Sequence, residues 1–215
     1  MRLDELRARL ATLPARLPPP PRELIPTVLA GPDGTPGTRP TFPDLPRRDA
    51  AVLILIHPDH AGQAMLVLTE RSPGDHRHAG QISLPGGAID ATESPTEAAL
   101  REAREEVGLD VDQAGVSVAG VLPTVDVRVS GFLVHPVVAF AQRAPRLEPD
   151  GYEVAAVFSA PLATFLPGAP IEMVTAERDG YRLRYGAYRV GERLVWGATA
   201  GILGSLGALL ARESQ

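Results

Sequence analysis

The sequence contains no cysteine and no lysine. Without a thiol, the chain cannot form a disulfide, a thiolate nucleophile, an iron–sulfur cluster or a zinc–thiolate site. Without lysine, it cannot form a Schiff base or supply the lysine of a phosphate-binding P-loop. The sequence also lacks a signal peptide, a terminal sorting tag and an apolar run long enough to cross a membrane, so we expect a cytoplasmic protein.

The chain also has no excess of positive charge. Its 26 acidic and 21 basic residues give a formal net charge of −5. This balance argues against nucleic acid or an anionic membrane surface as the main partner. All the basic residues other than histidine are arginines, whose planar guanidinium suits phosphate recognition. With 215 residues and an apolar fraction of 44%, the chain can form one sizeable domain.

The chain divides into two predicted regions. Leucines at helical spacing predict a short amphipathic helix within residues 1–17, and a Pro-rich irregular arm follows, so residues 1–48 form the first region. The apolar stripe of this helix can pack on its own domain or on a partner subunit, and the second alternative would give a homodimer. Residues 49–215 form the main domain.

The strongest local signals surround a helix predicted over residues 95–107. Ser94 is a good N-cap, Pro95 suits the first helical position, and Glu97 completes a capping box. Gly108 can end the helix in a left-handed conformation. The sequence therefore fixes both ends of this helix.

Three carboxylates share one face of this predicted helix, because residues advance by about 100° each. They belong to Glu102, Glu105 and Glu106. Like charges at these spacings repel, so the face is either a solvated surface with Glu–Arg pairs or a cation site. Ligands that offer only oxygen suit a hard ion such as Mg²⁺ or Mn²⁺.

The same stretch resembles the Nudix box, Gly-x5-Glu-x7-Arg-Glu-U-x-Glu-Glu-x-Gly-U, in which U is aliphatic. The matching residues are Gly87, Glu93, Arg101, Glu102, Ala103, Glu105, Glu106, Gly108 and Leu109. The resemblance implies an α/β fold of the α+β type, a Nudix-like α/β/α sandwich with a mixed β-sheet between helices. It also implies an enzyme that hydrolyses a diphosphate bond with Mg²⁺ or Mn²⁺.

The resemblance implies roles for the residues of the box. The expected metal ligands are Glu102, Glu105, Glu106 and the backbone carbonyl of Gly86 or, as an alternative, of Gly87. We expect Arg101 to orient the carboxylates and Glu93 to pair with Arg101 behind them. The general base differs among family members, and Glu102 is our first choice. Glu105 and Arg101 are also expected to take part in catalysis.

The loop before the box resembles a second motif, found in the coenzyme A pyrophosphatases of the Nudix family. Leu68-Thr69-x-Arg71-Ser72, then Gly80, then Pro85-Gly86-Gly87 follow its spacing. His76 stands where that subfamily has arginine, Arg77 comes one residue later, and Leu84 replaces the usual phenylalanine. The resemblance implies that the substrate phosphates are bound by residues of this loop, namely Arg71, His76, Arg77 and Gly80.

Arg128 and Glu153, which both follow the box in the sequence, complete the candidate site. Arg128 lies between two predicted strands, over residues 115–121 and 132–140, where the resemblance implies contact with substrate. Glu153 precedes a further strand, over residues 154–158, and is either a metal ligand or base or a charge at the edge of the sheet. A hairpin near residues 181–196 and a helix over residues 199–211 close the chain.

The favoured function is hydrolysis of coenzyme A and its derivatives to 3′,5′-ADP and 4′-phosphopantetheine. One alternative is a Nudix pyrophosphatase that acts on ADP-ribose, NADH or another nucleoside diphosphate derivative. A second is a Nudix module that binds a nucleotide without cleaving it. The intact set of three glutamates argues against the second alternative, because a binding module has no need of a repulsive carboxylate cluster.

Overall fold

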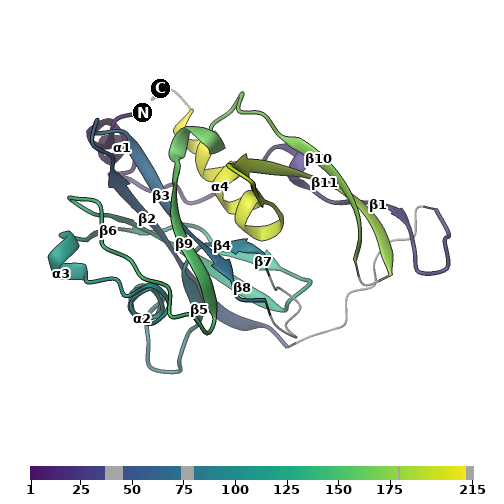
Figure 1. Ribbon diagram of the computed structural model, residues 1–215, viewed down its shortest axis with the longest axis horizontal. Coiled ribbons are helices and arrows are strands. Elements are labelled where there is room, and N and C mark those ends of the chain that lie inside the picture. The colour runs from purple at the N-terminus through teal and green to yellow at the C-terminus, as the bar shows by residue number, and fades with distance from the viewer. Residues whose placement is uncertain (37–45, 74–79, 179, 212–215) are drawn as a thin grey trace.

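A mixed β-sheet forms the middle layer of the computed structural model, which describes residues 1–36, 46–73, 80–178 and 180–211 (Figure 1). The strands are β2 (Arg48–Pro58), β3 (Ala64–Arg71), β4 (Ile82–Ser83), β5 (Gly86–Ala88), β6 (Ser117–Val121), β7 (Val125–Val127), β8 (Phe132–Phe140) and β9 (Val154–Pro161). The central order is β4-β3-β2-β8-β6, and β5, β7 and β9 pair with β2, β8 and β3 respectively. Among the described strands of this sheet, the pairing of β2 with β8 is the only parallel one, which makes the sheet mixed.

Helices cover both faces of this sheet. Helix α2 (Pro95–Val107) packs on one face, where its alanines meet Leu53 and Leu55 of β2. Helices α1 (Leu3–Arg9) and α4 (Gly197–Leu210) belong to the core on the other face, with Ile54 and Ile56. Alternate β2 residues thus enter opposite cores, which explains why this strand reads as a continuous apolar run. The predicted sandwich of helices around a mixed sheet is confirmed.

Several predicted elements are present with small changes of boundary. Strands β2 and β3 form the predicted antiparallel hairpin, with Ile56 opposite Leu66. The closing helix α4 begins at Gly197, two residues earlier than expected. Three short helices were not predicted: α3 (Val111–Ala114) and the 3₁₀ helices η1 (Arg22–Leu24) and η2 (Leu162–Phe165).

A second, antiparallel sheet extends away from the first (Figure 1). It contains β1 (Thr27–Ala30), β10 (Glu172–Arg178), β11 (Tyr181–Val190) and β12 (Arg193–Val195). Strand β11 is central and pairs with the other three. The interpretation of the N-terminal arm as irregular was therefore wrong for residues 27–30. Thr27 lies opposite Arg184, and this distant pairing converts a four-residue stretch into an edge strand.

The N-terminal helix α1 ends at Arg9 and is therefore shorter than the leucine pattern over residues 1–17 predicts. Its apolar stripe nevertheless packs on the chain's own domain, where Leu3, Leu6 and Leu10 are all buried in the core shared with α4. The guanidinium of Arg9 also donates to the carbonyl of Leu210 at the end of α4. Across the described ranges, no helix has the length and apolar character needed to span a membrane.

Candidate active site

Helix α2 presents the carboxylates because both of its ends are fixed. The hydroxyl of Ser94 accepts the backbone N–H of Glu97, whose carboxylate in turn accepts the N–H of Ser94 at 2.8 Å. At the other end, Gly108 adopts the left-handed conformation with φ of 65°. This conformation favours glycine, because other residues meet a steric penalty there. The predicted helix is thus confirmed at both ends.

Arg101 links the loop before α2 to the carboxylates on the helix. Its Nε and Nη2 donate to the two oxygens of Glu93 at 2.7 and 3.0 Å, a two-point contact that only a guanidinium can make. Its Nη1 donates to Glu102 at 2.8 Å and to Glu105 at 3.0 Å. The hydrogen bonds from Arg101 lower the pKa of Glu93. In return, the hydrogen bonds to Glu93, Glu102 and Glu105 raise the pKa of Arg101.

Strand β5 brings its backbone against the same group of side chains. Nη2 of Arg101 donates to the carbonyl of Ala88 at 3.1 Å. A Cβ atom placed on Gly87 would lie 2.5 Å from the carboxyl carbon of Glu102, so the carboxylate would have to move away. Glycine at position 87 therefore allows the carboxylate of Glu102 to lie against the backbone.

Glu106 differs from its neighbours because its residue is only 5% exposed. One carboxylate oxygen accepts the N–H of Gly86 at 3.0 Å. Burial raises the pKa of Glu106 to about 7, and the charges of Glu102 and Glu153 act in the same direction. The Gly86 amide and the charge of Arg71 act in the opposite direction but do not offset the burial. Glu106 is thus a buried carboxylate without full compensation for its charge.

Glu153 and Arg71 extend the site across the sheet. Their side chains form an ion pair at 3.8 Å, with Arg71 at the end of β3 and Glu153 directly before β9. The backbone carbonyl of Glu153 accepts the N–H of Ser72 at 2.9 Å. Both charges act on Glu106, so the structure brings the predicted loop arginine and the predicted second acid to the carboxylate helix.

Asp150 is a site residue that the sequence analysis missed. Its carboxylate accepts the backbone N–H groups of Tyr152, Glu153 and Val154, and its own N–H donates to the carbonyl of Glu106. It therefore fixes the turn that carries Glu153 next to α2. An Asp-Gly pair ahead of a strand is a turn signal that could have identified it.

The remaining predicted residues are less closely associated with the carboxylates. Arg128 is exposed and lies 3.5 Å from Asp126, which also pairs with Arg47. The N–H of Gly80 donates to the carbonyl of Arg71 at 3.1 Å, which holds this glycine beside the arginine. His76 and Arg77 lie outside the described residues.

The donor chemistry at α2 fits a hard divalent cation. The groups present are carboxylate oxygens and backbone carbonyls, and Glu106 is a buried acid whose charge a cation would stabilise. Among the described side chains, no three acids or histidines lie close enough together to hold an ion as they stand. Two of the acids are instead turned toward Arg101, and Glu106 is turned toward Gly86.

Comparison with known proteins shows the family to which the chain belongs. The sequence profile of the NUDIX domain matches residues 46–173, more than half of the chain. The protein named uncharacterized Nudix hydrolase NudL from Enterobacter sp. (strain 638) is 41% identical over 164 residues, which cover 75% of this chain and 82% of NudL. NudL from Escherichia coli (strain K12 / DH10B) is 42% identical over 163 residues, with the same coverage of both chains. The crystal structure of the M. smegmatis Nudix hydrolase RenU is 27% identical and covers 64% of this chain and 81% of its own, with a TM-score of 0.48.

The chain therefore belongs to the Nudix family. It is a Nudix hydrolase, an enzyme that hydrolyses a pyrophosphate bond in a small molecule derived from a nucleotide. Nudix hydrolases generally use divalent metal ions such as Mg²⁺ or Mn²⁺.

Proposed function

We propose that this Nudix hydrolase cleaves coenzyme A and its derivatives, giving 3′,5′-ADP and 4′-phosphopantetheine. The observation that supports this substrate is the position of Arg71. It belongs to the motif before the box, and its guanidinium forms a 3.8 Å ion pair with Glu153. The charges of both residues act on Glu106 of α2. A diphosphate bound between Arg71 and the carboxylate helix would receive a charge-assisted contact from the arginine.

The proposed roles of the acids follow from their surroundings. Glu102, Glu105, Glu106 and the carbonyl of Gly86 would hold Mg²⁺ or Mn²⁺. A divalent cation supplies charge neutralisation for the phosphates and lowers the pKa of water. Arg101 fixes Glu102 and Glu105 at 2.8 and 3.0 Å from one of its nitrogens, so the two carboxylates are positioned before substrate arrives. Glu93 holds Arg101 in turn.

Proton transfer is assigned to an acid that can reach the attacking water. We place Glu102 first because it is held by Arg101 and lies against Gly87. Glu153 is the second candidate, since the turn fixed by Asp150 holds it beside Arg71. Arg128, Gly80, His76 and Arg77 are proposed to contact the substrate. A cytoplasmic location and a homodimer remain predictions.

The test is product analysis by mass spectrometry. Purified protein is incubated with Mg²⁺ and, in separate reactions, with coenzyme A, ADP-ribose and NADH, and an EDTA control accompanies each. Metal-dependent release of 4′-phosphopantetheine from coenzyme A alone would support the proposal. Cleavage of ADP-ribose or NADH but not of coenzyme A would contradict it and leave the hydrolase class intact.

Two matched pairs of variants test the proposed residues. Glu105→Gln should remove most turnover, while Glu177→Gln, an exposed acid on β10, should not. Arg71→Ala should raise the KM for coenzyme A by more than tenfold, because a charge-assisted contact to phosphate contributes roughly 1.5–3 kcal/mol. Arg182→Ala, an exposed arginine on β11, is its control. An unchanged KM in the Arg71 variant would exclude this arginine from phosphate binding.

A further inference from the structure

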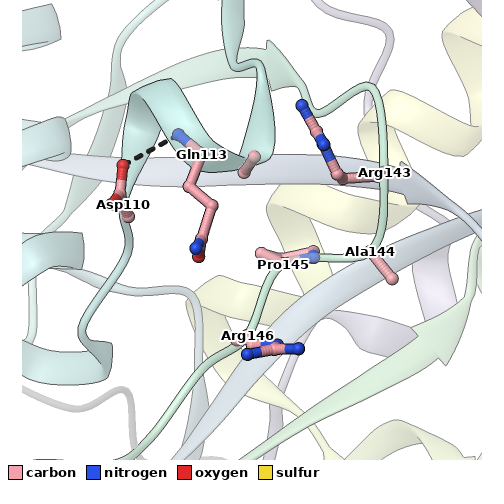
Figure 2. Close-up of a pocket in the computed structure, with 7 residues that line it drawn as sticks. Asp110, Gln113, Arg143, Ala144, Pro145 and Arg146 are labelled. Atoms are coloured by element: carbon pink, nitrogen blue, oxygen red, sulfur yellow. Dashed lines mark hydrogen bonds between the residues drawn. The ribbon is translucent and has the colours of Figure 1, made fainter.

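A cavity of about 220 Å³ lies apart from the carboxylates of α2, between α3 and the segment that follows β8. One wall belongs to α3 and its N-cap, and the other to residues 143–146. The lining residues are Asp110, Gln113, Ala114, Arg143, Ala144, Pro145 and Arg146 (Figure 2). None of them belongs to the proposed catalytic site.

The cavity wall is positively charged. Arg143 and Arg146 are both exposed, and neither has an ion-pair or hydrogen-bond partner in the part of the chain that the structure describes. The one acidic side chain in the wall is Asp110, and one of its oxygens already accepts the backbone N–H of Gln113 at 2.8 Å (Figure 2). The lining thus carries two guanidinium groups and one carboxylate, which already accepts a backbone N–H.

A neutral donor lies between the charged groups. The side chain of Gln113 extends from α3 across the space between the walls, and its amide has no partner among the described residues (Figure 2). An amide and two guanidinium groups provide N–H donors from both sides of the cavity. This donor set, with an excess of positive charge, suits an oxyanion.

The walls are held in place by backbone hydrogen bonds. The N–H of Gln142 donates to the carbonyl of Ala114 at 3.0 Å, immediately before the arginine segment. The N–H of Glu148, two residues beyond this segment, donates to the carbonyl of Val107 at 3.0 Å. Pro145 restricts the backbone between these two points. A ligand would therefore meet walls that are largely ordered already, which reduces the entropy lost on binding.

We propose that this cavity is a second binding site, which takes a phosphate monoester. The phosphate oxygens accept from Arg143, Arg146 and the amide of Gln113, and the open side of the cavity leaves room for the attached ester group. Hydrolysis of a diphosphate between two organic groups produces two phosphate monoesters, so the reaction class of this enzyme supplies such ligands. The proposal rests on that reaction class and does not depend on which diphosphate is the substrate.

The experiment is an NMR titration of the metal-free protein with inorganic phosphate and with AMP. Signals of the arginine Nε–H groups and the glutamine side-chain amides are followed, and KCl of equal ionic strength is the reference. We expect a saturable shift of the Arg143, Arg146 and Gln113 signals. Because no metal and no turnover are involved, failure to hydrolyse coenzyme A would leave this measurement unaffected.

Variants locate the binding. The double substitution Arg143→Ala/Arg146→Ala should weaken phosphate binding at least tenfold, equivalent to about 1.4 kcal/mol. The control Arg182→Ala/Arg184→Ala removes two exposed arginines of β11 and should leave the affinity unchanged. Arg71→Ala should also leave the shifts at Gln113 intact. Equal binding by the Arg143/Arg146 variant, shifts confined to Arg71, or the same shifts with KCl would each overturn the proposal.

Discussion

The burial of Glu106 predicts that the metal-free protein loses stability as the pH rises. Its pKa moves from the ordinary value of 4.5 in the unfolded chain to about 7 in the folded protein. The folded state therefore binds this proton more tightly than the unfolded state. The stabilisation by protonation is fully present below pH 4.5 and is lost as the pH rises through 7.

The size of the effect follows from the two pKa values. Each tenfold difference in proton affinity corresponds to about 1.36 kcal/mol, so ionised Glu106 destabilises the fold by about 3 kcal/mol at pH 8. More than half of this loss arises between pH 5 and pH 8. Solvent screens this charge weakly, because the residue is only 5% exposed.

The assay is urea unfolding of EDTA-treated protein at pH 5 and pH 8. Glu106→Gln retains an oxygen that can accept the N–H of Gly86 and removes the charge. The decline in the free energy of unfolding from pH 5 to pH 8 should therefore be about 2 kcal/mol smaller in this variant than in the wild type. Glu177→Gln removes an exposed carboxylate of β10 and should keep the wild-type pH dependence.

A parallel pH dependence in the wild type and Glu106→Gln would refute the reasoning, because it would mean that the ionised carboxylate is not destabilised by burial. A second measurement adds Mg²⁺ at pH 8. Since a bound cation would compensate the charge of Glu106, it should raise the stability of the wild type more than that of Glu106→Gln. Equal stabilisation of both proteins would remove Glu106 from the proposed ligand set.

Three further predictions concern other parts of the chain. Gly87→Ala should lower kcat by about 100-fold with the fold retained by circular dichroism, because its Cβ would displace the carboxylate of Glu102; wild-type kcat would show that this contact can relax. Ser94→Ala should lower the free energy of unfolding by about 1 kcal/mol without changing KM, because it removes the cap on the N–H of Glu97; urea unfolding and steady-state kinetics check both parts, and an altered KM would give Ser94 a role in substrate binding. Burial lowers the pKa of His57, so the stabilisation by its neutral ring is present above pH 6.5 and is lost as the pH falls. Between pH 7.5 and pH 5.5, the Tm of His57→Gln should therefore fall less than the Tm of the wild type. Equal declines in the two proteins would contradict this prediction.

The parts of the fold that were predicted are those encoded by neighbouring residues. The ends of α2 follow from Ser94 and Gly108, and the hairpin of β2 and β3 follows from two apolar runs separated by a short turn. The second sheet was only partly predicted. Strand β1 has four residues and an alternating exposure, and its partner β11 lies far along the chain, so no local pattern marks it.

The candidate site shows the same division. The box places Arg101 with Glu93, Glu102 and Glu105 because all four are close in sequence. The burial of Glu106 could not be read from the helical pattern, which places this acid on one face with the half-buried Glu102 and the exposed Glu105. It arises because Gly86, twenty residues earlier, covers the carboxylate with its backbone. Sequence periodicity records the face of a helix but not what packs on that face.

The pairing of β1 with β11 also has a consequence for the order of folding. During synthesis, residues 27–30 leave the ribosome long before Tyr181–Val190 exists, so this N-terminal strand must wait unpaired until most of the chain has been made. Leu24 likewise shares its core with α4, which is the last helix of the chain. The main sheet can assemble from segments closer together in sequence, whereas β1 joins the structure only after β11 has been made.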